Sequence, residues 1–317
     1  MRRGYAMNYN FEEITYPSSD GKNTVYAEIY TPKLKTARGI VQLAHGMVDH
    51  PGRYTSLIEY LTGEGYIFAG NHHLGHGRTA ATPEDFGYFA KSGGIDFLLS
   101  DIHSFNKYLR STYPTLPLVL LGHSMGSFLA RLYAVRHPHS MRGVIIHGTS
   151  GPNRLAPMGK FVARTVALFR TDRVRSKLIK KLAFGSYNGR FDKSEGETAW
   201  LSRDTAAVSC KHNDPLASFT FTASGFADLF EMLHASNKRS WFKNYPKDMR
   251  TLIMSGEDDP VGGFGKGVNY VYRRLMLEGC TDVSIKLYPE CRHELFNELS
   301  REEIFADIRS WLEGVGV

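Results

Sequence analysis

Apolar and polar positions change their spacing along the chain, and the change separates two kinds of strand. Residues 11–17 and 24–32 alternate apolar and polar side chains, which predicts two half-buried antiparallel strands joined by a turn. Short, nearly continuous apolar runs follow, as is typical of parallel strands covered on both faces. These runs lie at 38–46, 66–73, 117–124 and 141–149, with helical spacing between them at 54–65, 95–114 and 125–138. The first 150 residues therefore predict a mostly parallel sheet flanked by helices.

The strand pattern stops near Gly151 and resumes near residue 246. Between these points the apolar residues recur at helical spacing, for example at 226–233. The pattern then predicts a strand at 249–255, a helix at 267–279, a strand at 282–290 and a closing amphipathic helix at 301–315. No internal repeat divides the chain. We therefore expect one α/β core, formed by residues 1–151 and 246–317, with a helical cap inserted at 152–245.

Composition excludes several classes of protein. The chain has 317 residues, of which 42% are hydrophobic and 22% charged, so intrinsic disorder and small disulfide scaffolds are excluded. Its longest apolar runs fall far short of the roughly 18 residues that a membrane-spanning helix needs. The basic start is not followed by the apolar stretch of a secretory signal, and the three cysteines form no CxxC pair. We therefore expect an unexported, cytoplasmic protein.

Positive charge is concentrated in the expected insertion. The formal net charge is +7, and residues 152–211 hold 13 Lys and Arg against 5 Asp and Glu. A basic face could attract nucleic acid or an anionic membrane, but no helix-turn-helix or RNA-binding motif accompanies it. We expect no nucleic-acid partner and a mainly solvated face, with peripheral contact to an anionic membrane as the alternative.

The segment Gly122-His123-Ser124-Met125-Gly126 is the strongest local signal of chemistry. It lies directly between an expected buried strand and an expected helix, and it matches the GxSxG pattern of a nucleophile elbow. The two glycines allow a turn so sharp that the serine is held in a strained conformation, with its hydroxyl above the sheet. Ser124 is therefore the candidate nucleophile.

A serine hydroxyl is a weak nucleophile, so this hypothesis requires a histidine base and a carboxylate at later strand ends. Of the thirteen histidines, His293 is the one in the required place, after the last expected strand. The loop that follows the preceding strand offers Glu257, Asp258 and Asp259 as acids. Position along the chain leaves the choice among them open.

A loop on the same sheet edge is a candidate oxyanion hole. The strand at 38–44 runs directly into His45-Gly46-Met47. The backbone N–H groups of Met47 and Met125 would converge on the negative oxygen of a tetrahedral intermediate. We also expect His45 and Gly46 to contact the substrate.

Together these segments resemble the α/β-hydrolase fold, and more narrowly its monoacylglycerol lipase and lysophospholipase branch. The resemblance is carried by HG at 45–46, GHG at 75–77, GHSMG at 122–126, GEDDPV at 256–261 and RHELFNE at 292–298. It covers nearly the whole chain, and the insertion falls where that branch carries its helical cap. It implies Ser124 as nucleophile, His293 as base and Asp259, rather than Asp258, as the acid.

The loop at 71–77 departs from that branch, because His72 stands where the family usually has Asp. That Asp is not part of the triad, so the change leaves the chemistry intact but puts in doubt the hydrogen bonding that the carboxylate provides to the loop. The change also creates a histidine cluster with His73 and His76. No HExxH pattern or matched carboxylates accompany the cluster, so we expect no metal.

Substrate selectivity is expected to reside in the insertion. Phe219, Phe226 and Phe230 could line an apolar slot for an acyl chain, or they could form the insertion's own core. The basic residues that could draw it onto an anionic membrane are Arg170, Arg173, Arg175, Lys177, Lys180 and Lys181.

These features predict a serine hydrolase that cleaves carboxylic esters of lipids through an acyl-enzyme, without a cofactor. The resemblance implies a monoacylglycerol or a lysophospholipid-like substrate. Two alternatives stay open: a peptidase or amidase that acts on small substrates in the same fold, and a non-catalytic lipid carrier that uses the same pocket. The oligomeric state is also left open.

Overall fold

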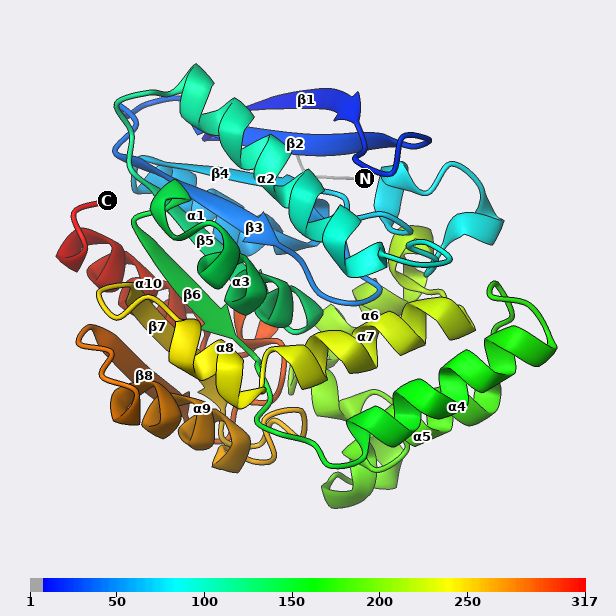
Figure 1. Cartoon of the computed structure of the whole chain (residues 1–317). Coiled ribbons are helices and arrows are strands. Elements are labelled where there is room, and N and C mark those ends of the chain that lie inside the picture. The colour runs from blue at the N-terminus through cyan, green and yellow to red at the C-terminus, as the bar shows by residue number, and fades with distance from the viewer. Residues whose placement is uncertain (1–7) are drawn as a thin grey trace.

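A computed structural model describes residues 8–317 (Figure 1). The basic residues Arg2 and Arg3, on which part of the expectation of an unexported protein rests, lie outside the described residues. Over residues 8–317, eight strands form one sheet in the order β1-β2-β4-β3-β5-β6-β7-β8. They are β1 (Tyr9–Pro17), β2 (Thr24–Pro32), β3 (Gly39–Ala44), β4 (Tyr66–Asn71), β5 (Leu118–His123), β6 (Gly143–His147), β7 (Arg250–Gly256) and β8 (Val283–Tyr288).

Strand direction and burial follow the expected pattern. Strand β2 pairs antiparallel with β1 and β4, and every later pairing is parallel. Strands β3, β5 and β6 are buried along their whole length, because helices cover both faces of the sheet there. Strand β1 lies at an edge and exposes most of its residues. The α/β fold class expected from the sequence is confirmed.

Five helices cover the sheet: α1 (Thr55–Gly63), α2 (Gly94–Thr112), α3 (Met125–Arg136), α9 (Lys266–Leu277) and α10 (Arg301–Gly314). Helices α1 and α10 share one apolar cluster with the sheet, through residues such as Leu57 and Ile308. Helices α2, α3 and α9 share another, through residues such as Ile102, Leu129 and Val271. None of the helices in residues 8–317 is both long and apolar enough to cross a membrane.

Residues 152–245, here called the insertion, contain helices and turns between β6 and β7. The helices are α4 (Ala156–Phe169), α5 (Lys177–Phe184), α6 (Thr205–Asn213), α7 (Ala223–Ala235) and α8 (Arg239–Asn244). Helices α4 and α7 pack on each other, and α7 also packs on α3. In Figure 1, helices α4 to α7 gather beyond the end of the sheet toward which β6 points. The insertion therefore lies over the edge where the parallel strands end, which is where α/β sheets bind ligands.

Candidate active site

Ser124 occupies a tight turn between β5 and α3. Its backbone has φ 54° and ψ −118°, a region that residues other than glycine rarely adopt. A Cβ atom on Gly126 would lie 1.9 Å from the carbonyl oxygen of Ala44, and one on Gly122 would lie 2.3 Å from the carbonyl oxygen of Gly126. Only glycine fits at either position, which gives the GxSxG spacing a steric cause. The Ser124 N–H donates to the carbonyl of His147 at 2.9 Å and fixes the turn to β6.

The Ser124 hydroxyl lies within reach of a histidine that is itself held by a carboxylate. Ser124 Oγ is 2.8 Å from His293 Nε2, and His293 Nδ1 is 2.9 Å from Asp259 Oδ2. Asp259 is fully buried, and its Oδ1 accepts the N–H of Val261 at 2.8 Å. Asp258 is exposed. An Nδ1–H donated to the carboxylate leaves Nε2 free to accept the serine proton, which is the arrangement that activates a serine nucleophile.

Two unused backbone donors lie beside Ser124. Met125 begins α3, so its N–H has no partner within the helix. Met47 lies on the loop after β3, and a Cβ on Gly46 would come within 3.3 Å of the Ser124 Cβ. No acceptor is assigned to either N–H within the described part of the chain. Paired free donors next to a nucleophile are what an oxyanion hole requires.

His45 is buried beneath this loop and fixes it through hydrogen bonds to backbone groups. His45 is fully buried; its Nδ1 donates to the carbonyl of Gly46 at 2.8 Å, and its Nε2 accepts the N–H of His73 at 3.0 Å. Neither His45 nor Gly46 is among the residues that line the pocket above Ser124. Both ring nitrogens of His45 are bonded to backbone groups, one in its own loop and one after β4, so the expectation that His45 and Gly46 contact the substrate gains no support from the structure.

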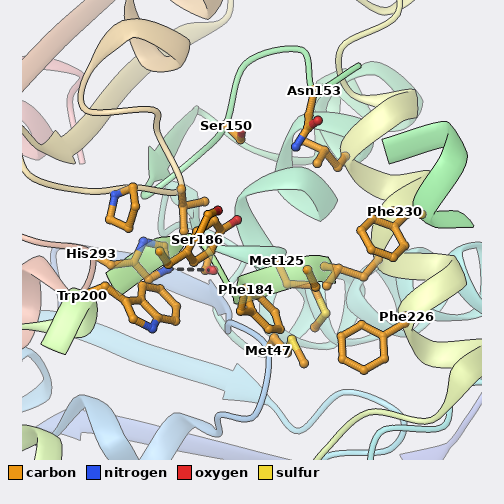
Figure 2. A pocket seen from close by; sticks show the side chains of 18 of the residues that line it. Met47, Met125, Ser150, Asn153, Phe184, Ser186, Trp200, Phe226, Phe230 and His293 are labelled. Carbon is orange, nitrogen blue, oxygen red and sulfur yellow. Dashed lines mark hydrogen bonds between the residues drawn. The ribbon is translucent and has the colours of Figure 1, made fainter. Parts of the chain in front are cut away.

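A cavity of about 1000 Å³ opens above Ser124 between the core and the insertion. Phe219, Phe226 and Phe230 line it, as do Phe184 and Trp200, which the sequence had not singled out. Figure 2 shows rings of this lining around the side chains of Met47 and Met125. Phe226 is fully buried and also belongs to the main apolar cluster, so the slot and the insertion's core share residues.

A family described as "Serine aminopeptidase, S33" (Hydrolase_4) matches residues 35–300. The chain belongs to this family. It is 27% identical, over 95% of its length and 96% of the relative's, to the monoacylglycerol lipase of Mycolicibacterium smegmatis. It is 25% identical to the human monoglyceride lipase, over 87% and 83% of the two chains. A carboxyl esterase from Bacillus coagulans, solved in complex with glycerol, is 31% identical and superposes with a TM-score of 0.90 over 97% of this chain and 99% of that one. These matches make the chain an ester hydrolase of the α/β-hydrolase superfamily, in its monoacylglycerol lipase branch.

His72, which stands where the family resemblance implies an aspartate, keeps a hydrogen bond to its loop. Its Nδ1 accepts the N–H of Arg78 at 3.2 Å, and its Nε2 lies 3.0 Å from Glu28 Oε1 on β2. Burial lowers the pKa of the neighbouring His73 to about 3 and that of His76 to about 4, so both rings are neutral near pH 7. No cluster of metal-ligating side chains occurs within residues 8–317.

Glu294, the residue after His293, belongs to a buried group of four charged side chains in this hydrolase. Glu294 accepts from Arg53 Nη2 at 3.0 Å and from Lys211 Nζ at 3.1 Å, and Arg53 Nη1 also donates to Asp49 at 2.8 Å. Burial alone would raise the pKa of the Glu294 carboxyl, but the two cations hold it well below its usual range. The sequence reasoning missed this group. Its one signal was Glu294 inside the RHELFNE segment, because the other three residues are distant in the chain.

Proposed function

We propose that this hydrolase cleaves carboxylic esters of lipids through an acyl-enzyme on Ser124, with His293 as base and Asp259 as the acid that orients it. The carrying observation is the 2.8 Å approach of Ser124 Oγ to His293 Nε2 at a cavity of about 1000 Å³ whose lining is largely apolar. A slot of this kind suits an acyl chain better than a charged substrate.

In the proposed reaction, His293 Nε2 takes the hydroxyl proton while Ser124 Oγ attacks the ester carbonyl carbon. The carbonyl oxygen becomes negative and accepts hydrogen bonds from the backbone N–H groups of Met47 and Met125. Protonated His293 then gives its proton to the leaving alcohol, and acyl-Ser124 remains. Water attacks the acyl group, loses a proton to His293, and releases the carboxylic acid as Ser124 regains its proton.

We further propose that residues 152–245 act as a cap that selects the substrate, over a core of residues 1–151 and 246–317. The names of the two relatives favour a monoacylglycerol, and a lysophospholipid-like substrate shares its single acyl chain. Polar side chains that line the same cavity, Ser150, Asn153 and Ser186, could receive the hydroxyls of a head group (Figure 2).

Helices α4 and α5 offer a surface for peripheral membrane contact. Four apolar side chains are more than half exposed there: Phe161, Leu168, Phe169 and Leu178. On most protein surfaces, exposed apolar residues are scattered singly and are not grouped on neighbouring helices in this way. Of the basic residues in this segment, Arg173 and Arg175 are used elsewhere, because they bond to the core loop at 83–86. No ion pair is assigned, within the described residues, to Arg170, Lys177, Lys180 or Lys181. Exposed apolar and free cationic side chains together fit an anionic bilayer surface.

The first test is hydrolysis of p-nitrophenyl esters from acetate to palmitate and of 1-monoacylglycerol, with Ser124→Ala run in parallel. We expect a medium or long acyl optimum and a loss of about 10⁴-fold or more in the variant, which should stay folded. Faster cleavage of an aminoacyl p-nitroanilide than of any ester would favour the peptidase alternative. Full activity of the purified variant would remove Ser124 from the mechanism. An inactive wild type that does not react with a fluorophosphonate but binds fatty acyl probes would favour the carrier.

Membrane contact is tested by co-sedimentation with vesicles of phosphatidylglycerol and of phosphatidylcholine. We expect binding to the anionic vesicles that Leu168→Ser combined with Phe169→Ser abolishes. The matched control is Leu277→Ser, a similarly exposed apolar residue on α9 of the core. Equal binding by all three proteins would contradict contact through α4 and α5.

A further inference from the structure

Lys211, on helix α6 of the insertion, reaches into the catalytic centre of the core. Its Nζ donates to the carbonyl of Val48 at 3.2 Å and to Glu294 Oε1 at 3.1 Å, and its side chain is only 13% exposed. Val48 directly follows Met47, and Glu294 directly follows His293. One side chain of the insertion therefore touches the loop of the proposed oxyanion donor and the loop of the proposed base.

Val48 needs support because its backbone is strained. Its φ is 53°, and a β-branched residue in that region is a genuine outlier. Such a conformation persists only where the surroundings hold it. The Val48 N–H donates to His76 Nε2 at 3.2 Å, and its carbonyl accepts from Lys211. The two contacts clamp the peptide groups on both sides of Val48, and so fix the chain immediately after Met47.

The same part of the insertion is seated on the core at further points. The N–H of His293 donates to the carbonyl of Trp200 at 3.3 Å, and the N–H of Glu294 donates to the carbonyl of Leu201 at 2.7 Å. Three residues after Lys211, Asp214 Oδ2 lies 2.7 Å from His50 Nε2. The loop at 47–50 and the loop at 293–294 are thus both bonded to the insertion. Each loop is therefore held in part by the insertion and in part by the core.

We propose that Lys211 is a positioning residue that completes the catalytic centre from the insertion. When the insertion is seated, Lys211 holds the Met47–Val48 loop and the His293–Glu294 loop in register with each other. When it is not seated, the oxyanion donor loses its fixed direction. The inference rests on the proposed function, because it assigns to Lys211 the support of Met47 and His293.

The test compares Lys211→Met with Lys211→Arg, which keeps a cation that can donate to both acceptors. The matched control is Lys193→Met, an exposed lysine of the insertion whose side chain has no assigned bond to any of residues 8–317. The substrate is p-nitrophenyl acetate, whose acyl group is too short to fill the slot. We expect Lys211→Met to lower kcat by about 10-fold or more with KM within about twofold, since losing a whole oxyanion donor costs about 10²–10³-fold. Labelling of Ser124 by a fluorophosphonate should slow in parallel. Lys211→Arg should recover part of the loss, and Lys193→Met should match the wild type.

An unchanged kcat in folded Lys211→Met, or the same loss in Lys193→Met, would overturn the inference. A rise in KM alone would also overturn it, because Lys211 would then be a substrate contact. If Lys211→Met does not fold, Asp214→Asn replaces it. That variant weakens the adjacent seat on His50 without removing a buried cation, so kcat should fall and an unchanged kcat would count against the proposal. A wild type that is inactive on every ester would instead refute the proposed function.

Discussion

The two strained turns beside the reacting oxygen are held by different parts of the molecule. Ser124 in the elbow and Val48 in the oxyanion loop have nearly equal positive φ angles, 54° and 53°. The elbow is held within the core, because Gly122 lets β5 and α3 approach closely, Gly126 lets α3 approach the end of β3, and the Ser124 N–H donates to His147 on β6. The oxyanion loop has no such glycine after Val48 and depends on His76 and on Lys211, a residue of the insertion. Strain at the nucleophile is thus held by the strands and the helix of the core around it, whereas strain at the oxyanion loop depends also on the seating of the insertion.

The largest effect is expected from Gly126→Ala, which disturbs the elbow that holds Ser124. The added methyl would lie 1.9 Å from the Ala44 carbonyl oxygen, so α3 or the end of β3 must move. A shift of about 1 Å at the nucleophile costs about 10²-fold or more in rate. We expect loss of ester hydrolysis and of fluorophosphonate labelling, or loss of folding.

Gly63→Ala is the matched control for this prediction. A Cβ at Gly63, on helix α1, would meet nothing within 4 Å. Alanine there should keep full activity and could raise the free energy of unfolding by about 0.4–1 kcal/mol. Equal activity of both variants would show that the elbow tolerates a side chain and would remove the steric argument.

A second prediction concerns the buried histidines around the oxyanion loop, which acidification should destabilise. Burial lowers the pKa of His73 to about 3 and that of His76 to about 4, and it holds the pKa of His45 well below the usual range. The unfolded chain binds protons on these rings near pH 6.5, whereas the folded chain does not, so stability falls as the pH falls below about 6.5. His76 alone should account for about 3 kcal/mol by about pH 4. Asp228 acts in the opposite direction, because burial raises its pKa to about 6 and the folded chain therefore binds that proton before the unfolded chain does. Carboxylates whose pKa is lowered in the folded chain add their own loss only below about pH 4.5.

Urea unfolding at several pH values between about 6.5 and 4.5 checks this prediction, and the slope should correspond to uptake of more than one proton on unfolding. His76→Gln should reduce the slope, since it removes one titrating ring. A free energy of unfolding that stays constant over this window would contradict the assignment of neutral buried histidines around the oxyanion loop.

The same contrast explains what could be predicted from the sequence. Hydrophobic periodicity predicted the strands and helices because each element buries a face of its own. The elbow was visible because its glycines adjoin Ser124, and Asp259 was chosen over Asp258 only through the family resemblance. The roles of Lys211 and Trp200 were invisible, because they depend on how the insertion folds back over the sheet. The support that His45 gives to the oxyanion loop was invisible for a related reason: the partner of its Nε2 is the N–H of His73, which follows the neighbouring strand β4.

The smallest effect is expected at the periphery of the oxyanion loop, from restoring the family residue with His72→Asp. An Asp oxygen can replace His72 Nδ1 as acceptor for the N–H of Arg78, so the loop keeps that bond. The contact to Glu28, now 3.0 Å from His72 Nε2, would become a meeting of two buried carboxylates. We expect a loss of about 1–3 kcal/mol in the free energy of unfolding, measured near pH 8, above the ordinary histidine pKa of about 6.5. His72→Asn keeps the acceptor without the charge and should cost less. Combining Glu28→Gln with His72→Asp should return the protein to about the stability of His72→Asn, since only the repulsion is removed. If His72→Asp is as stable as His72→Asn, repulsion from Glu28 does not explain why this chain has His72 in place of Asp. The contact between His72 and Glu28 would then add nothing to the support that His76 gives to the oxyanion loop.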